Sequence, residues 1–155
     1  MDNEKIDQLL HIEAIKNLRI LYSHYLDSNK LKKLTQLLTV DAIVQTDRDP
    51  WQGRDGIYAG LDKAFKEYDK SNNGSYPFLH AVTNHWVEIT GPATARGKCY
   101  LIDLVTGRPK NESPLLLLGL YADDYVLING KWQISKSRLD LVWPERNIDD
   151  LQMRS

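Results

Sequence analysis

The first part of the chain has the spacing of apolar residues that is typical of amphipathic helices. From about Glu4 to Leu26, apolar residues recur every three or four positions, as they do on the buried face of a helix. These residues are Ile6, Leu9, Leu10, Ile15, Leu18, Leu21, Tyr22, Tyr25 and Leu26. His11 and Ile12 interrupt the pattern, so we expect a short helix followed by a longer one.

Two further helices and one strand are predicted before residue 70. Residues 27–29 (Asp-Ser-Asn) are candidate N-caps for a second helix. The apolar positions of that helix are Leu31, Leu34, Leu37 and Leu38. Residues 42–44 are a strand candidate that ends in a polar loop over residues 45–54. A third helix is predicted over residues 56–68, with its apolar residues on one side.

The second half of the chain favours strands. Residues 78–143 contain four long strand-like runs, separated at residues 91–92 (Gly-Pro), 107–114 and 129–130 (Asn-Gly). Asn-Gly is a strong hairpin signal because both residues tolerate the positive φ of a type I′ turn. Helices followed by an antiparallel meander indicate an α+β fold, with the helices on one face of a curved sheet. Such an arrangement leaves a cavity that can take a small molecule.

Composition narrows the class of protein. The chain has 155 residues, enough for a single domain over residues 1–155, with a core over about 7–143. Its 20 Lys and Arg against 21 Asp and Glu argue against a nucleic-acid partner. Without a long apolar run or an apolar N-terminal segment, we expect a cytoplasmic protein with no membrane partner. A single cysteine, Cys99, allows no internal disulfide.

One carboxylate is predicted to face the interior. Along residues 93–105, Asp103 shares its face with small and apolar residues, because side chains two apart point to the same side of a strand. An inward carboxylate is costly unless it is paired or lies in a cavity. The alternative is a bulge near the end of the strand that frees Asp103 to solvent.

Two histidines lie on one predicted strand, residues 78–89. His80 and His85 are five apart, so regular alternation puts their rings on opposite faces and makes them a poor chelating pair. No other metal-ligand spacing occurs in the sequence, and we predict no bound metal. His80 alone is a weak signal and needs a partner.

The end of the first helix offers that partner. Tyr22 and Tyr25 precede Asp27 by about one turn or less. The helix dipole disfavours a carboxylate at this end. Asp27 is therefore either a cap for the next helix or a functional group.

The order of short motifs along nearly the whole chain resembles the SnoaL-like branch of the NTF2-like superfamily. The motifs are Glu13-Ala14-Ile15-Lys16-x-Leu18, Tyr22-x4-Asp27, Asp41-Ala42, Gly53-Arg54-Asp55-Gly56-Ile57, His80-x3-Asn84, Thr94-Ala95, Gly119-Leu120-Tyr121-x-Asp123-x-Tyr125 and Gly130-Lys131-Trp132-Gln133-Ile134. The resemblance implies a cone-shaped α+β fold, in which N-terminal helices pack on a strongly curved, mostly antiparallel sheet around an apolar pocket.

Within the superfamily the likeness is nearest to bile-acid 7α-dehydratases, with scytalone dehydratases and a lindane dehydrochlorinase more distant. It implies that Asp27 and His80 form a catalytic pair and that Tyr22 and Asp103 join them. Two positions depart from the dehydratase pattern. Residues 45–47 (Gln-Thr-Asp) stand where those enzymes have a pocket tyrosine, and their last-strand arginine falls near Leu141, three residues after Arg138.

If these groups share one pocket, they describe a cofactor-free lyase or isomerase, most simply a dehydratase acting on a hydrophobic cyclic substrate. His80, oriented by Asp27, would be the general base. Candidate substrate-binding residues are Tyr25, Trp51, Phe65, Phe78, Trp86 and Tyr121. Two alternatives stay open: a non-catalytic ligand-binding or interaction module, and a proton-shuttling isomerase of the ketosteroid type. The apolar run at residues 115–118 further predicts a homo-oligomer, a dimer or trimer.

Overall fold

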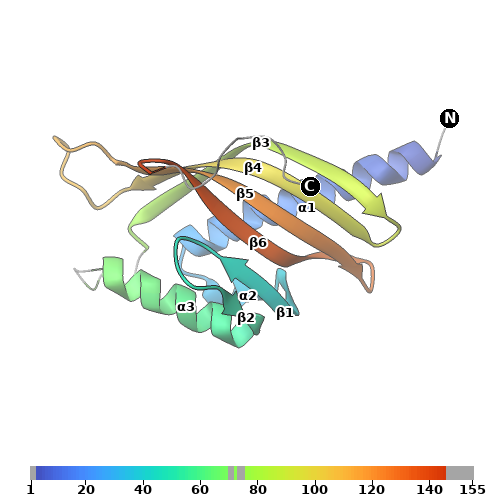
Figure 1. Cartoon of the computed structure of the whole chain (residues 1–155), viewed down its shortest axis with the longest axis horizontal. Helices are drawn as coiled ribbons and strands as arrows, with labels where there is room; N and C mark the ends of the chain where they lie inside the picture. The colour runs from blue at the N-terminus through green and yellow to red at the C-terminus, as the bar shows by residue number, and fades with distance from the viewer. Residues whose placement is uncertain (1–2, 70–71, 73–75, 146–155) are drawn as a thin grey trace.

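Three helices and six strands form an α+β structure in the computed structural model, which describes residues 3–69, 72 and 76–145. The helices are α1 (Asn3–Asp27), α2 (Leu31–Thr35) and α3 (Gly53–Tyr68). The strands are β1 (Leu38–Gln45), β2 (Trp51–Gln52), β3 (Phe78–Gly91), β4 (Thr94–Val105), β5 (Leu115–Ile128) and β6 (Lys131–Trp143). α1 crosses behind the long strands, whereas α3 lies beside β1 and β2 (Figure 1).

α1 is one continuous helix, so the predicted break at His11 and Ile12 is wrong. The sequence there contains no proline or glycine that would interrupt the backbone. His11 instead has a packing role, because its Nδ1 accepts a hydrogen bond of 3.0 Å from Trp132 Nε1 on β6. α1 runs on to Asp27 and so carries that carboxylate to the far end of the sheet.

α2 is only five residues long and is not capped as predicted. Lys30 is its N-cap, and no side chain donates or accepts a capping hydrogen bond there. Leu38 belongs to β1 rather than to the helix and pairs with Ile134 of β6. The predicted helix therefore ends early, because the residues that follow it pair with β6 in the sheet.

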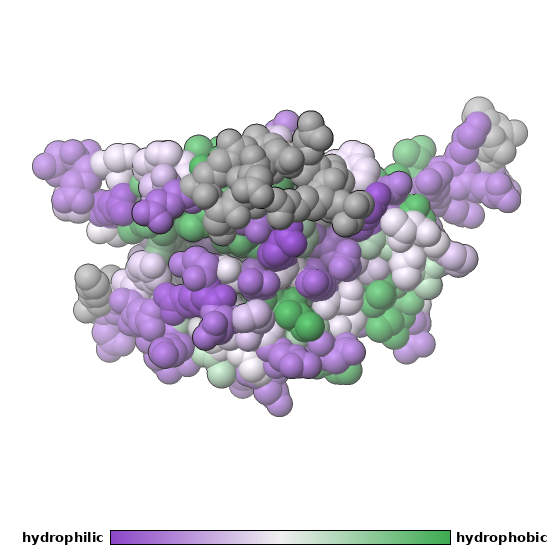
Figure 2. All heavy atoms as spheres, viewed as in Figure 1, coloured by the Kyte–Doolittle hydropathy of each residue, from purple (hydrophilic) through white to green (hydrophobic). Residues whose placement is uncertain are grey.

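α3 begins at Gly53, three residues before the predicted start, and buries the side predicted to be apolar. Its opposite side is largely hydrophilic in the view of Figure 2. The short strand β2, which directly precedes it, was not predicted. Among the helices described here, none is both long and apolar enough to cross a membrane.

The sheet is mixed, with the strand order β2-β1-β6-β5-β4-β3. The four long strands form the predicted antiparallel meander, and β1 pairs with β6 in parallel. Asn129 and Gly130 have φ values of 50° and 75°, which confirms the predicted tight turn between β5 and β6. The strong curvature of the sheet stays a prediction.

A β-bulge in β3 changes which side chains face the helices. Thr83 pairs with Tyr100 and Trp86 with Lys98, so two residues of β3 stand opposite one residue of β4. Asn84 within the bulge has a φ of 54°. The prediction that the two histidines of this strand lie on opposite faces is therefore wrong: His85 joins the inner face.

Candidate active site

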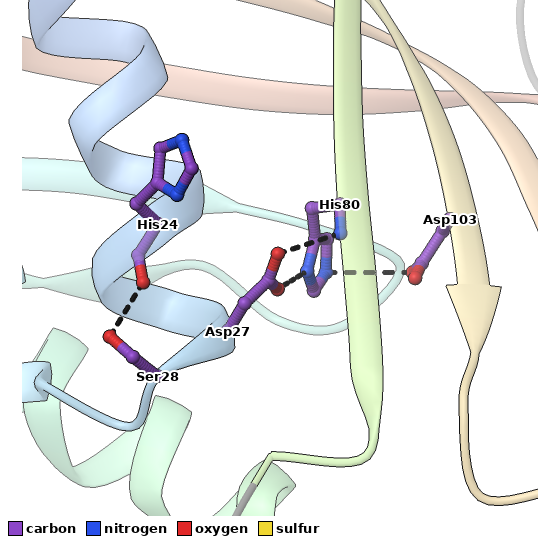
Figure 3. Close-up of polar contacts among 5 residues, drawn as sticks. All are labelled: His24, Asp27, Ser28, His80 and Asp103. Carbon is purple, nitrogen blue, oxygen red and sulfur yellow. Dashed lines mark hydrogen bonds and ion pairs between the residues drawn. The ribbon is translucent and has the colours of Figure 1, made fainter.

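The last residue of α1 and the third residue of β3 form a close pair. Asp27 Oδ2 accepts a hydrogen bond of 2.9 Å from the backbone N–H of His80, and Asp27 Oδ1 lies 2.5 Å from His80 Nδ1 (Figure 3). The two contacts fix both the strand and the imidazole ring against the end of the helix. Because an ionised carboxylate can only accept, they also indicate that His80 Nδ1 carries the proton. His80 Nε2 then presents its lone pair on the other side of the ring.

Asp103 lies on that other side. It is the β4 residue paired with His80, and its Oδ2 is 3.6 Å from His80 Nε2 (Figure 3). Asp103 is only 6% exposed, so the alternative that a bulge frees it to solvent is wrong. The register shift between β4 and β5 comes one residue later, at Leu104.

The surroundings of Asp103 favour its neutral form. Burial raises the pKa of this carboxyl to about 6, with the negative charge of Asp27 adding to the increase and His80 opposing it. Its Oδ1 has no hydrogen-bond partner among the residues that the structure describes. His80 thus lies between two acidic side chains. Asp27 is hydrogen-bonded to it, and Asp103 has a raised pKa. Such a set can move protons.

A cavity of about 110 Å³ adjoins the imidazole and Asp103. Its walls combine leucines and aromatic residues with polar groups, which include His80 and Asp103. The residues that share this lining include Leu26, Leu61, Leu101, Leu117, Tyr76 and Tyr121. For comparison, a dry cavity of roughly 150 Å³ holds one benzene ring. This cavity is smaller, so in this form it has no room for a fused multi-ring skeleton.

Most of the aromatic residues predicted for the site lie at or next to the cavity. Tyr22, Trp51, Phe78 and Tyr121 line it. Phe65 is buried behind the wall and stacks on Tyr76, with ring centroids 5.4 Å apart.

Two predicted binding residues lie elsewhere. Tyr25 packs against the hydrophobic core and is not part of the cavity wall. Trp86 is 43% exposed, because the bulge in β3 turns it to the outer face of the sheet.

The entrance of the cavity is polar at the positions that depart from the dehydratase pattern. Residues 45–48 (Gln-Thr-Asp-Arg) line it. Arg48 forms an ion pair of 2.8 Å with Glu67 of α3. Arg138 lies on the opposite side of β6 from the cavity and binds Asp140 at 2.9 Å. No group of three or more His, Cys, Asp or Glu side chains in the described ranges is arranged to hold a metal ion.

Sequence reasoning missed Tyr76 and Arg19. Tyr76 follows a loop without periodicity, and its ring centroid is 5.9 Å from that of His80. Arg19 is fully buried beneath the cavity. Its position was readable, since residue 19 lies one turn after Ile15 and three residues before Tyr22, on the apolar stripe of the helix.

Comparison with known structures identifies proteins of the same architecture. A hexachlorocyclohexane dehydrochlorinase, LinA-type3 from Novosphingobium barchaimii LL02, has a TM-score of 0.77 at 18% identity, covering 98% of this chain and 100% of its own. Rv3472, a protein of unknown function from Mycobacterium tuberculosis, also scores 0.77 at 18% identity, with coverages of 91% and 77%. A provisionally named scytalone dehydratase from Novosphingobium aromaticivorans scores 0.70 at 22% identity, with coverages of 86% and 85%. These likenesses establish the fold.

The family is established by sequence. No curated protein matches the chain. The family model of the SnoaL-like domain matches residues 7–138, which include the Asp27, His80 and Asp103 positions and most of the sheet. The chain therefore belongs to the SnoaL-like domain family, with the NTF2-like fold that its sequence motifs predicted.

Proposed function

We propose that the protein is a cofactor-independent lyase that dehydrates a small cyclic β-hydroxy carbonyl compound. The observation that carries the proposal is His80, held by Asp27 on one side and facing Asp103 across 3.6 Å on the other, at the wall of a cavity lined by leucines, aromatic residues and a few charged groups. The names of two structural relatives, a dehydrochlorinase and a provisionally named dehydratase, are those of elimination enzymes.

In this proposal His80 Nε2 accepts the proton from the carbon next to the carbonyl. The hydrogen bond from Nδ1 to Asp27 supports the positive charge that develops on the ring. The electrons of the broken C–H bond first form an enolate, with the negative charge on the carbonyl oxygen, and then return to form the new C=C bond as the C–O bond to the leaving hydroxyl breaks. Positioned general acid–base catalysis of this kind contributes roughly 10²–10⁴-fold.

Asp103 supplies the proton that converts the leaving hydroxyl to water. Its raised pKa, about 6, keeps a larger protonated fraction than an exposed aspartate would have near neutral pH. After water leaves, the proton gained by His80 can pass to Asp103 Oδ2, 3.6 Å away, which restores both groups. The cycle therefore needs no outside acid or base.

Tyr22 and Tyr121 complete the proposed site. Both line the cavity, and neither hydroxyl has a hydrogen-bond partner among the residues described here. A phenol hydroxyl that is free to donate can stabilise the enolate oxygen that forms when the proton is removed.

The cavity limits the substrate class. A volume of about 110 Å³ sets one ring as the upper limit for the substrate, and the polar lining at residues 45–48 suits a polar substituent. A steroid skeleton does not fit in this form of the cavity. We therefore favour one-ring β-hydroxy ketones over hydroxysteroid-like compounds.

The test is a screen of cyclic β-hydroxy ketones, graded from one ring to four, with enone absorbance as the readout. We expect turnover of one-ring compounds by the wild type. His80→Ala should reduce the rate constant roughly 10²–10⁴-fold with little change in ligand affinity, since the lost interaction acts mainly in the transition state. Asp27→Asn should lower the rate less, because it keeps the base.

The matched control is His24→Ala, three residues before Asp27 on the same helix. His24 is exposed, and its ring points away from the pair (Figure 3). This variant should keep wild-type rates. Equal rates for wild type and His80→Ala would remove His80 from the mechanism, and the absence of turnover across the panel would favour the ligand-binding alternative.

A further inference from the structure

The cavity has a buried cation beneath it. The Arg19 side chain is fully buried, and its guanidinium carbon lies 3.5 Å from the ring centroid of Tyr121 and 4.5 Å from that of Tyr22. Both tyrosines also line the cavity. One charged group thus contacts both of the tyrosines proposed above as donors to the substrate.

Filling of space alone does not explain why an arginine is buried at this position. Removing a guanidinium from water is costly unless its donors are satisfied. Arg19 has one ion pair with Asp123, of 3.5 Å between Nε and Oδ2, and one hydrogen bond of 3.5 Å from Nη1 to Ser137 Oγ. Its Nε and Nη2, and Asp123 Oδ1, have no hydrogen-bond partner within the described part of the chain. A methionine or leucine would fill the space at lower cost.

The counter-charge of Arg19 is Asp123 on β5, the strand that also carries Tyr121. Asp123 Oδ2 accepts a hydrogen bond of 2.9 Å from Tyr125, and the Tyr125 hydroxyl is 3.4 Å from His85 Nε2. Burial lowers the pKa of His85 to about 4, so this imidazole is neutral near pH 7. The cluster is thereby fixed, and the cation, rather than its counter-ion, lies against the two rings.

A cation on the face of a phenol favours negative charge on that ring system. Burial raises the pKa of both Tyr22 and Tyr121, and Arg19 acts in the opposite direction on each. Their hydroxyls are therefore better donors than equally buried phenols without the arginine would be.

We propose that Arg19 is a positioning residue, which holds Tyr22 and Tyr121 and strengthens them as hydrogen-bond donors to an oxyanion in the cavity. The inference rests on the proposed function for the identity of that oxyanion, an enolate, but the donor site itself can be tested without turnover. Arg19 does not contact the substrate and acts through the two rings.

The probe is 4-nitrophenol, a one-ring phenol whose phenolate is distinguished from the phenol by its absorbance. Nitrobenzene is the neutral ligand of the same shape. Affinities for both are measured for wild type, Asp123→Asn, the double variant Arg19→Met/Asp123→Asn, and Arg96→Met. The double variant removes both buried charges at nearly constant volume, and Arg96 is a control because it pairs with Glu88 away from the cavity.

We expect the wild type, Asp123→Asn and Arg96→Met to prefer the phenolate to nitrobenzene. The double variant should lose about tenfold in phenolate affinity while its nitrobenzene affinity stays within about twofold. Arg19→Lys/Asp123→Asn, which keeps the cation, should recover part of the preference.

Equal losses for the two ligands in the double variant would overturn the proposal, because they indicate a packing role. A wild type that binds no phenolate, or binds it no better than nitrobenzene, would overturn it as well. Failure of the enone screen with phenolate preference intact would reject the dehydratase and keep the oxyanion site, so the two outcomes are distinguishable.

Discussion

Asp27 and Asp103, the two aspartates of the candidate site, have different surroundings. Asp27 accepts two hydrogen bonds and is partly open to solvent, with 24% of its side chain exposed. Asp103 is buried and leaves one oxygen without a hydrogen bond from any described residue. This difference in surroundings supports the different roles proposed for them, an orienting group for Asp27 and a proton donor for Asp103.

The buried Asp103 predicts a pH dependence of stability. Its pKa is about 6 in the folded protein against an ordinary value of 3.8, so the folded state binds the proton more tightly. The stabilisation by this proton is complete below about pH 4 and is lost as pH rises through about 6. The loss amounts to about 3 kcal/mol.

The measurement is urea unfolding of wild type and Asp103→Asn at several pH values. Asp103→Asn, which has no proton to lose, should gain about 3 kcal/mol relative to wild type between about pH 4 and pH 8. A constant difference between the two proteins over that range would contradict the raised pKa.

At the residue scale, the sequence predicts site residues best where a polar residue interrupts an apolar pattern. Asp103 interrupts a small, apolar strand face, and alternation was sufficient to put it inside. Arg19 interrupts a helical stripe in the same way and was missed, because long basic side chains on such stripes usually reach solvent. Tyr76 lies in an irregular segment with no apolar pattern that it could interrupt. Only its contacts with Phe65 and His80 in the structure place it at the site.

Among the elements, the β-bulge in β3 has the largest effect on the site. It lets one strand present both His80 and His85 to the inside and turns Trp86 outward. Alternation cannot predict this, because a single extra residue inverts the facing of everything after it. The local signal is Asn84, since asparagine is among the few side chains that adopt a positive φ readily.

The bulge predicts how Asn84 responds to substitution. Asn84→Val should destabilise the protein by about 1–3 kcal/mol, because a β-branched residue is strained at a φ of 54°. Asn84→Gly should stay within about 0.5 kcal/mol of wild type. Thermal or urea unfolding measures both, with Thr83→Val as the control for losing the 2.9 Å hydrogen bond from the Thr83 hydroxyl to Asn84 Oδ1. Equal stability of Asn84→Val and Asn84→Gly would show that the backbone at this position is not held in the left-handed region.

The boundaries of α2 and β1 show a second limit of local patterns. Leucines at residues 34, 37 and 38 suit a helix, yet the backbone N–H of Ile134 donates to Leu37 O and Leu38 pairs within the sheet. The pairing partner lies almost a hundred residues away. Local spacing contains no information on that competition.

On the scale of the whole molecule, the outer face of the sheet exposes more large apolar side chains than is usual for a surface in contact with water. Leu79, Trp86, Tyr100 and Ile102 are exposed on the neighbouring strands β3 and β4. An antiparallel sheet with helices on one side normally alternates apolar and polar residues. Adjacent exposed apolar residues of this kind are typical of a surface that another protein covers.

We therefore expect a homodimer or homotrimer that uses this face. Light scattering at micromolar concentration should report two or three times the chain mass of 17.9 kDa. The double variant Tyr100→Glu/Ile102→Glu should dissociate to monomers, because charges are unfavourable in the buried centre of an interface. Tyr58→Glu, at an exposed aromatic position on α3, is the matched control. A wild type that stays at 17.9 kDa would contradict the expectation.

The hydrogen bond from the His80 backbone to Asp27 also bears on how the protein stays in solution. β3 is at the end of the strand order, so it presents a sheet edge with backbone groups that a foreign strand could pair with. Asp27 Oδ2 occupies one of those groups and places a negative charge beside the edge. We therefore expect the Asp27 carboxylate also to disfavour pairing of β3 with a strand of another molecule, so that a variant without it aggregates more readily.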